Sequence, residues 1–234
     1  MKANNASAVR LIAMDRQLLK ILAQAKKFPN FVSMNLFSDT ALFDEGRKRF
    51  TDFGLPETDL RLWEQFLTKK DADTYFTLLR ETTPWQQRTR KMYDIVVLDP
   101  RLTAWYGGTN GLEWTPELLA IRRVVEKECG TSFNRVLLNY YRDGNDSVAW
   151  HSDTLPADGK HHAVASVTLG DTRLFKVRHK MRKDVMLNIP LTHGSFLLMG
   201  ETMQDHYEHH VPKTSRPVGP RINLTFRIST GEAA

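Results

Sequence analysis

The spacing of apolar positions changes along this chain, from helical before Gly130 to short strand-like runs after it. The sequence Thr68-Lys69-Lys70-Asp71 is typical of a helix start, because a threonine cap is followed three residues later by an acid. This helix is expected to run to about Arg80 and to end before Pro84.

A second helix is expected to open at Thr115, with Pro116 in its first turn. Leu118, Ile121 and Val125 would share its apolar face, and Gly130 would end it. The later runs are candidate strands at 135–141, 163–169, 174–178, 185–189, 195–199 and 221–228. Two helices followed by many short strands predict an α+β fold whose strands close as a double-sheet jelly roll.

The N-terminal part of the chain has a different character. Its first 33 residues are basic, with Asp15 as the only acid, and an apolar stripe there predicts a surface helix through Leu18, Leu19, Leu22 and Ala25. We therefore expect an N-terminal extension over residues 1–57 and the main domain over residues 58–234. An acid-poor amphipathic leader that targets an organelle is the alternative.

Composition narrows the class of protein. Hydrophobic residues make up 41% of the chain, but no apolar run is long enough to predict a transmembrane helix. The net charge of +6 favours polyanionic partners, above all nucleic acid. Cys129 is the only cysteine, so no intrachain disulfide forms, which fits a reducing cytoplasmic location, with a nuclear or organellar one as alternative.

The sequence His151-Ser152-Asp153 offers two candidate metal ligands, and Tyr207-Glu208-His209-His210 follows far downstream. Residues two apart on a strand point to the same face, so His151 and Asp153 can reach one ion. A histidine from a distant strand would complete a facial triad, which leaves positions open for iron(II) to bind an oxoacid and dioxygen. A surface turn holding a hydrogen-bonded pair is the alternative. Competitors for the third position are His161, His162, His179, His193, His206 and His210.

The segment from Arg221 to Arg227 carries two arginines on one face of a predicted strand. In extended geometry Asn223 and Thr225 share this face, while Ile222, Leu224 and Phe226 face the core. Two buried guanidinium groups require anionic partners, and a dicarboxylate would supply two. A solvated polar face on an edge strand is the alternative. Asn139 and Tyr141 also alternate onto one face as neutral donors, unless Tyr141 is simply a core residue.

These segments resemble, in order, the AlkB family of alkylation-repair dioxygenases, closest to the eukaryotic DNA- and RNA-repair homologues and related bacterial enzymes. The matching motifs run from about Trp85 to Arg227. They are Pro100-Arg101-Leu102-Thr103-Ala104-Trp105-Tyr106-Gly107, Asn139-Tyr140-Tyr141-Arg142-Asp143-Gly144, Asp146-Ser147-Val148-Ala149-Trp150-His151-Ser152-Asp153, Ala165-Ser166-Val167-Thr168-Leu169-Gly170, His193-Gly194-Ser195, Val211-Pro212-Lys213 and the Arg221–Arg227 segment.

The resemblance implies a double-stranded β-helix, a jelly-roll form, with supporting N-terminal helices. It assigns iron(II) to His151, Asp153 and His209, since His209 has the family's spacing before Val211-Pro212-Lys213. It also assigns 2-oxoglutarate to a polar set with neutral and cationic members: Asn139, Tyr141, Arg221, Asn223, Thr225 and Arg227.

The implied reaction uses dioxygen to hydroxylate an N-alkyl group on a base of DNA or RNA, releasing aldehyde, succinate and CO2. A monomer acting on flipped or single-stranded bases, without a membrane, is expected. Trp105 and Tyr106 are candidate base-stacking residues, and the basic stretch around Arg90 is a candidate contact with the backbone. Core packing of the aromatics and a solvated basic face are the alternatives. A protein or small-molecule substrate, or a catalytically silent nucleic-acid-binding module, are the competing functions.

Two departures from the family pattern bear on substrate choice. Family members often carry an acid just after the metal aspartate, where this chain has Thr154 and Leu155. The loop after Tyr106-Gly107 is also short, where relatives carry aromatic contacts with the base. An apolar wall at Leu155 predicts a weaker preference for cationic methylated bases over neutral adducts.

Overall fold

The computed structural model describes residues 50–92 and 95–229, with the side chains of residues 90–95 left out. The helix expected near the N-terminus lies outside these residues. The helices are α2 (Lys69–Thr82), α3 (Pro116–Cys129) and the short α4 (Met203–His206). The strands are β1 (Thr51–Asp52), β2 (Leu60–Trp63), β3 (Thr89–Met92), β4 (Ile95–Leu98), β5 (Leu102–Gly107), β6 (Arg135–Tyr141), β7 (Val148–His151), β8 (Val164–Gly170), β9 (Arg173–His179), β10 (Met186–Leu191), β11 (Phe196–Met199), β12 (Tyr207–Val211) and β13 (Arg221–Arg227).

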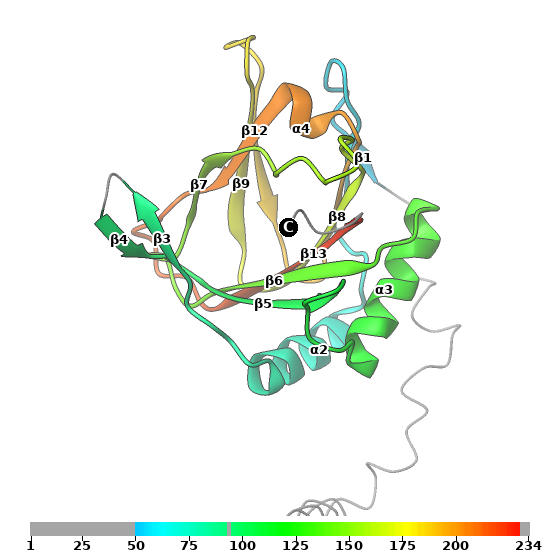
Figure 1. Ribbon diagram of the computed structural model, residues 1–234, viewed down its shortest axis with the longest axis vertical. Coiled ribbons are helices and arrows are strands. Elements are labelled where there is room, and N and C mark those ends of the chain that lie inside the picture. The colour runs from blue at the N-terminus through cyan, green and yellow to red at the C-terminus, as the bar shows by residue number, and fades with distance from the viewer. Residues whose placement is uncertain (1–49, 93–94, 230–234) are drawn as a thin grey trace, which may run out of the picture. The chain divides into compact units, whose positions relative to one another are not determined.

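Two antiparallel sheets form the body of the domain (Figure 1). The larger sheet has seven strands in the order β1-β2-β11-β8-β13-β6-β5, and the smaller has four in the order β10-β9-β12-β7. From β6 to β13 the chain crosses repeatedly between the two sheets, as it does from β6 to β7, which is the crossing pattern of a jelly roll. The predicted fold class is confirmed.

The two longer helices begin and end where their capping residues predict. The Thr68 side chain accepts a hydrogen bond from the Asp71 backbone N–H at 3.2 Å, and Thr115 caps α3 in the same way through Leu118. Gly130 ends α3 in the left-handed conformation, at φ 66°, which a glycine adopts without steric cost.

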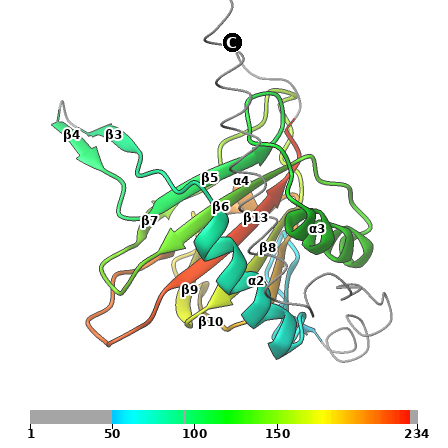
Figure 2. The ribbon, with the colours of Figure 1, turned by 90° about the horizontal axis from the view of Figure 1, so that it is seen from below.

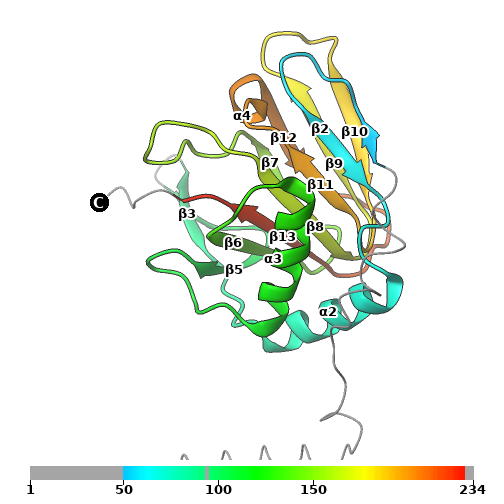
Figure 3. The ribbon, with the colours of Figure 1, turned by 90° about the vertical axis from the view of Figure 1, so that its right-hand side faces the viewer.

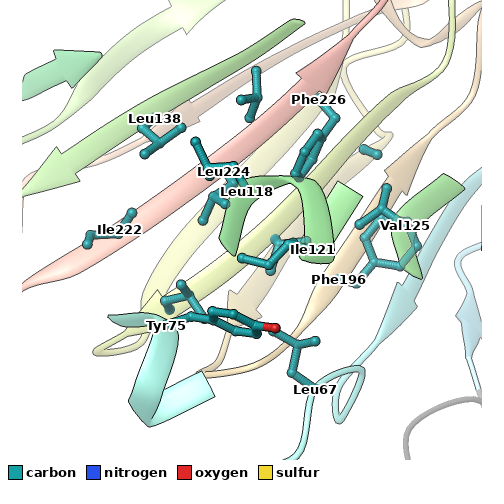
Figure 4. Packing of buried hydrophobic residues seen from close by; sticks show 14 of the residues in the cluster. Leu67, Tyr75, Leu118, Ile121, Val125, Leu138, Phe196, Ile222, Leu224 and Phe226 are labelled. Atoms are coloured by element: carbon teal, nitrogen blue, oxygen red, sulfur yellow. The ribbon is translucent and has the colours of Figure 1, made fainter. Parts of the chain in front are cut away.

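Both helices cover one face of the seven-stranded sheet (Figure 2 and Figure 3). Ile222, Leu224 and Phe226 of β13 point into this helix-covered core, together with Leu118 and Ile121 of α3 (Figure 4). A second apolar cluster lies between the two sheets. Truncating a fully buried Phe226 to alanine would cost roughly 3–5 kcal/mol of stability, because a cavity would be added to the lost burial.

The strands before Gly130 were not expected from the sequence. In β5 the burial pattern lacks a regular two-residue alternation. The sequence therefore shows no alternation between a solvent-exposed and a buried face of this strand. Beyond the helix-covered part, β3 and β4 form a separate hairpin that extends away from both sheets (Figure 1 and Figure 2). Strand β1 pairs with β2, although the sequence assigned residues 51–52 to the N-terminal extension.

Among the described residues, no helix has the length and apolar character needed to cross a membrane.

Candidate active site

Two histidines from neighbouring strands of the smaller sheet face each other. His209 of β12 is the direct pairing partner of His151 at the end of β7. The two rings have centroids 4.4 Å apart, and His209 is buried. The ring nitrogen Nδ1 of His151 lies 2.9 Å from the Ala149 carbonyl, which favours the tautomer with the lone pair on Nε2.

Asp153 lies just beyond the end of β7, in the loop rather than on the strand itself. Its Oδ1 is 3.7 Å from His151 Nε2 and 3.9 Å from His209 Nε2. Its backbone N–H donates to Gln204 Oε1 at 2.8 Å, and Gln204 is itself buried. The carboxylate is therefore held beside both imidazoles by a side chain from α4.

The charges around this cluster favour the ionisation states that a cation requires. Burial opposes ionisation of Asp153, but nearby positive charge, above all Arg227, lowers its pKa below the usual value. Burial also lowers the pKa of His209 to about 3, so this imidazole is neutral at physiological pH. A carboxylate and neutral imidazoles are the forms that bind a metal ion.

The donor set fits an iron(II) ion. The ligand atoms of His151, Asp153 and His209 all lie within 4.8 Å of one another, and they supply two nitrogens and one oxygen. Three protein ligands on one side leave the opposite positions open for small molecules.

The cavity beside this cluster has a volume of about 70 Å³ and is lined by cationic and neutral polar groups of β13 and β6. Arg221 is fully buried, and its Nη2 donates to Thr168 Oγ1 at 2.9 Å. Within residues 50–92 and 95–229, its Nε and Nη1 have no acceptor. Burial lowers the pKa of Arg221 to about 10, which still leaves the guanidinium charged at neutral pH.

Arg227 connects the cavity to the histidine cluster. Its Nη2 lies 3.0 Å from Asp153 Oδ2, while its Nε is buried without an acceptor in the part of the chain that the structure describes. Two neighbouring guanidinium groups with buried, unused N–H donors are costly unless an anion joins them. The residues therefore fit a dicarboxylate such as 2-oxoglutarate, bound next to the metal site. Strand β13 lies between β8 and β6, so the alternative of a solvated edge strand is wrong.

The other residues expected to bind the co-substrate also line this cavity. Tyr141 lies under Arg221, whose guanidinium carbon is 5.1 Å from the ring centroid. The Asn223 amide donates to Ser166 Oγ and to the Val167 carbonyl, and its Oδ1 accepts from Thr225 Oγ1 at 3.1 Å. Because these bonds already occupy Asn223, it serves to orient Thr225.

Sequence reasoning missed Arg101, Ser166 and Gln204. Arg101 lines the cavity and donates to Asn139 Oδ1 at 2.8 Å, which fixes that amide. The residues next to Arg101 in the sequence do not distinguish it from an exposed arginine. Gln204 lies on a four-residue helix whose relation to Asp153 exists only in three dimensions.

The two aromatic candidates face opposite ways. Trp105 pairs with Leu137, a cavity-lining residue, and lies on the same face of the larger sheet. Tyr106 instead lies in the helix-covered core with 3% of its surface exposed, so the prediction that it contacts a base is wrong for this structure. Trp105, its neighbour on β5, faces the cavity side of the sheet, because successive side chains on a strand alternate. Arg90 lies on β3, and its side chain is outside the described residues.

The remaining histidines have other partners. His206, His161, His162 and His193 lie near Glu57, Asp205, Asp158 and Asp73 respectively. His210 borders the cavity and stacks on Trp150, with ring centroids 3.8 Å apart.

A second group of metal-ligand types consists of Glu57, His179 and His206. The Nδ1 of His179 accepts hydrogen bonds from the backbone N–H groups of Met181 and Arg182. In the neutral ring the proton is then on Nε2, which donates to Glu57 at 2.8 Å. His179 therefore has no free lone pair for a metal ion, and its contact with Glu57 is a hydrogen bond within the protein.

Known proteins are similar to this chain in fold and in sequence. The solved structure titled "The structure of OsALKBH1" has the same fold, with a TM-score of 0.58 at 16% identity, covering 77% of this chain and 100% of that chain. The chain is 39% identical over 180 residues to "Alpha-ketoglutarate-dependent dioxygenase alkB homolog 3" of Bos taurus, covering 69% of this chain and 63% of that protein. It is 37% identical over 121 residues to "DNA oxidative demethylase ALKBH2" of Homo sapiens, covering 49% of this chain and 46% of that protein.

The chain thus spans less than two thirds of the length of these two relatives. A family model described as the 2OG-Fe(II) oxygenase superfamily matches residues 59–227, which include the histidine–aspartate cluster and both cavity arginines. By this match and by its identity to the AlkB homologues, the chain belongs to the 2OG-Fe(II) oxygenase superfamily and, within it, to the AlkB family.

Proposed function

We propose that this protein removes alkyl groups from N-alkylated bases of DNA or RNA by oxidation, using iron(II), 2-oxoglutarate and dioxygen. The observation that carries the proposal is the junction at Arg227. One guanidinium contacts the candidate metal ligand Asp153 at 3.0 Å and keeps an unused N–H donor beside the cavity. An anionic co-substrate bound there lies next to the metal site.

In this proposal His151, Asp153 and His209 hold the iron, and Arg221 and Arg227 bind the two carboxylates of 2-oxoglutarate. When bound, iron and 2-oxoglutarate supply the oxidising chemistry that hydroxylates the N-alkyl carbon, after which the alkyl group leaves as an aldehyde. The protein orients these partners: Arg101 fixes Asn139, Asn223 fixes Thr225, and Gln204 fixes the backbone of Asp153.

The substrate part of the proposal rests on the relatives and on charge. The bovine relative is named a dioxygenase of the alkB homolog 3 type and the human relative a DNA oxidative demethylase. The net charge of +6 favours a polyanion. A base stacked inside a duplex cannot reach a recessed site, so the enzyme acts on flipped or single-stranded bases, as a monomer.

The test is succinate release by the purified full-length chain, with iron(II), 2-oxoglutarate and one of several single-stranded oligonucleotides. The panel carries methylated or etheno-adducted bases at one fixed position, and the matched control is the unmodified oligonucleotide. We expect succinate release that depends on the lesion. Mass spectrometry of the oligonucleotide should show that the unmodified base is restored.

The outcomes separate the competing functions. Succinate release that is indifferent to every lesion would favour a protein or small-molecule substrate. Binding of oligonucleotides without succinate release in any condition would favour a silent nucleic-acid-binding module.

A further inference from the structure

The cavity-facing side of the larger sheet continues past the candidate co-substrate site toward β5. In the pairing between β13 and β6, Arg227 lies opposite Arg135 and Thr225 opposite Leu137. In the pairing between β6 and β5, Leu137 lies opposite Trp105. Arg135 and Trp105 are therefore next to Arg227 and Leu137, on the face of the sheet that also carries the cavity-lining residues.

Arg135 is placed on this side by strand alternation. Val136 and Leu138 of β6 point into the helix-covered core, whereas Leu137 and Asn139 line the cavity. Arg135 shares the face of Leu137 and Asn139, just beyond the cavity lining, because residues two apart on a strand point to the same side. Its guanidinium carbon lies over the Trp105 ring, 4.1 Å from the centroid.

This stacked guanidinium has an unused donor. The Nε of Arg135 is buried and has no hydrogen-bond acceptor among the described residues. A guanidinium that stacks on an aromatic face keeps its N–H groups directed outward in its own plane. A buried N–H without an acceptor is costly, and an acceptor supplied by a ligand would remove that cost.

The charge around the cavity is positive. The charged groups among the described cavity-lining residues are Arg101, Arg221, Arg227 and a single acid, Asp153, which already pairs with Arg227. Thr154 and Leu155 bring no carboxylate after Asp153.

The next acid along the chain is already engaged elsewhere. The Asp158 carboxylate bonds to the ring of His162 at 2.7 Å, so it is not poised to compensate for the missing charge.

We propose that Arg135 is a specificity-determining residue that selects neutral N-alkylated bases with a carbonyl oxygen beside the alkylated nitrogen. Its Nε donates to that carbonyl, and its charge disfavours bases that are themselves cationic. This inference rests on the proposed function, since it concerns the base that enters the same site.

Two methylated pyrimidines of nearly equal shape express this difference. In 3-methylthymine the methylated nitrogen is flanked by two carbonyl oxygens, and the base is neutral. In 3-methylcytosine one of these carbonyls is replaced by an amino group, and the base carries a positive charge. An arginine donor complements either carbonyl of the first, whereas in the second it meets a like charge and, at the position of the amino group, another donor.

The experiment measures kcat/KM of the full-length iron-loaded enzyme for one single-stranded sequence carrying either base at the same position. The variants are Arg135→Gln, which removes the charge, and Arg135→Lys, which keeps the charge but loses the planar stack and the Nε donor. The matched control is Arg122→Gln. Arg122 also lies over a tryptophan, 4.9 Å from the Trp114 ring, but on helix α3.

We expect Arg135→Gln to lower the ratio of kcat/KM for 3-methylthymine over 3-methylcytosine about tenfold, the size of effect expected when a charged donor is lost. Arg135→Lys should give a smaller decrease because it restores only the charge, and Arg122→Gln should leave the ratio unchanged. An unchanged ratio in Arg135→Gln, or an equal change in Arg122→Gln, would overturn the role of Arg135.

The two proposals fail in different ways. If the wild type turned over neither lesion, the proposed function would be wrong. The binding of the same two oligonucleotides to wild type and Arg135→Gln, measured by fluorescence anisotropy with Mn²⁺ and a non-reactive 2-oxoglutarate analogue, would still decide the inference. Equal binding ratios in the two proteins would contradict it.

Discussion

His151 and His209 are direct pairing partners across β7 and β12, with their rings 4.4 Å apart. The sheet register itself therefore positions two of the three candidate metal ligands. Because a shift by one residue would turn a side chain to the other face, the pairing of β12 with β7 and β9 fixes which histidine is presented. The third ligand, Asp153, is held separately by Gln204 and Arg227.

The first prediction concerns metal binding. Alanine at His151, Asp153 or His209 removes one of three protein ligands, so each variant should lower the affinity for Co²⁺, used as a probe for iron(II), by at least about tenfold. Visible absorption during a Co²⁺ titration measures this, and succinate release should be abolished in parallel. The matched control is His206→Ala, whose ring lies beside Glu57 in the other histidine group. Equal losses in His206→Ala and His209→Ala would contradict the assignment.

The second prediction concerns the co-substrate. Arg221→Lys and Arg227→Lys keep the charge but lose the planar fork that binds a carboxylate through two N–H groups. Each should raise the KM for 2-oxoglutarate about tenfold or more, while oligonucleotide binding changes little. Arg178→Lys serves as control, because that guanidinium pairs with Glu208 and lies over Trp150. A KM that matches the wild type in both cavity variants would exclude these arginines from co-substrate binding.

The third prediction concerns the residues after the metal aspartate. Leu155 is 51% exposed, and Leu155→Asp would add a carboxylate two residues after Asp153. A carboxylate there should favour cationic bases, but solvent screens an exposed charge, so the shift should be about two- to fivefold. The measurement is the ratio of kcat/KM for a cationic methylated base over a neutral etheno base in one sequence. A wild type that already strongly favours the cationic base, with no response to Leu155→Asp, would place this selection at another residue.

The fourth prediction concerns the loop that leads into β7. Asp146 is buried and accepts hydrogen bonds from the backbone N–H, Nε and Nη2 of Arg142. Burial opposes its ionisation, but these bonds lower the pKa of Asp146 below its usual value. Because the folded pKa is the lower one, the stabilisation is complete above the unfolded pKa and is lost as pH falls through the folded pKa.

Asp146→Asn should therefore lower the free energy of unfolding at pH 7 by about 1–3 kcal/mol. The difference from wild type should stay constant down to about pH 5 and shrink below the usual carboxyl pKa of about 4. Urea unfolding across this range measures it. A difference that grows as the pH falls would show that Asp146 is protonated in the folded protein.

The fifth prediction concerns nucleic-acid binding by the β3–β4 hairpin. If the protein binds phosphates, its affinity for an unmodified oligonucleotide should fall steeply with salt concentration. Reversing the charges of Arg88, Arg90 and Lys91 together should reduce the slope of log affinity against log salt concentration by about three, because about three phosphate contacts are lost. The control is reversal of Lys69 and Lys70, at the start of α2. An unchanged salt dependence in the hairpin variant would place the binding surface elsewhere.

The sequence by itself determined the features that depend on near neighbours. The caps of α2 and α3 follow from Thr68, Thr115 and Gly130, because capping bonds join residues only a few positions apart. The two faces of β13 follow from strand alternation, which is a local property of extended backbone.

Contacts between residues far apart in the sequence depend on how the strands pair. Strand pairing places His209 opposite His151, while His210 stacks on Trp150, although the two histidines are adjacent in sequence. The sequence did not predict β5, so it could not show that Trp105 and Tyr106 face opposite ways or which of them faces the cavity. That choice depends on the helices, which bury Tyr106 on their side of the sheet. The contact of Arg135 with Trp105 likewise arises from the pairing of β6 with β5, because local sequence carries no record of which strands become neighbours.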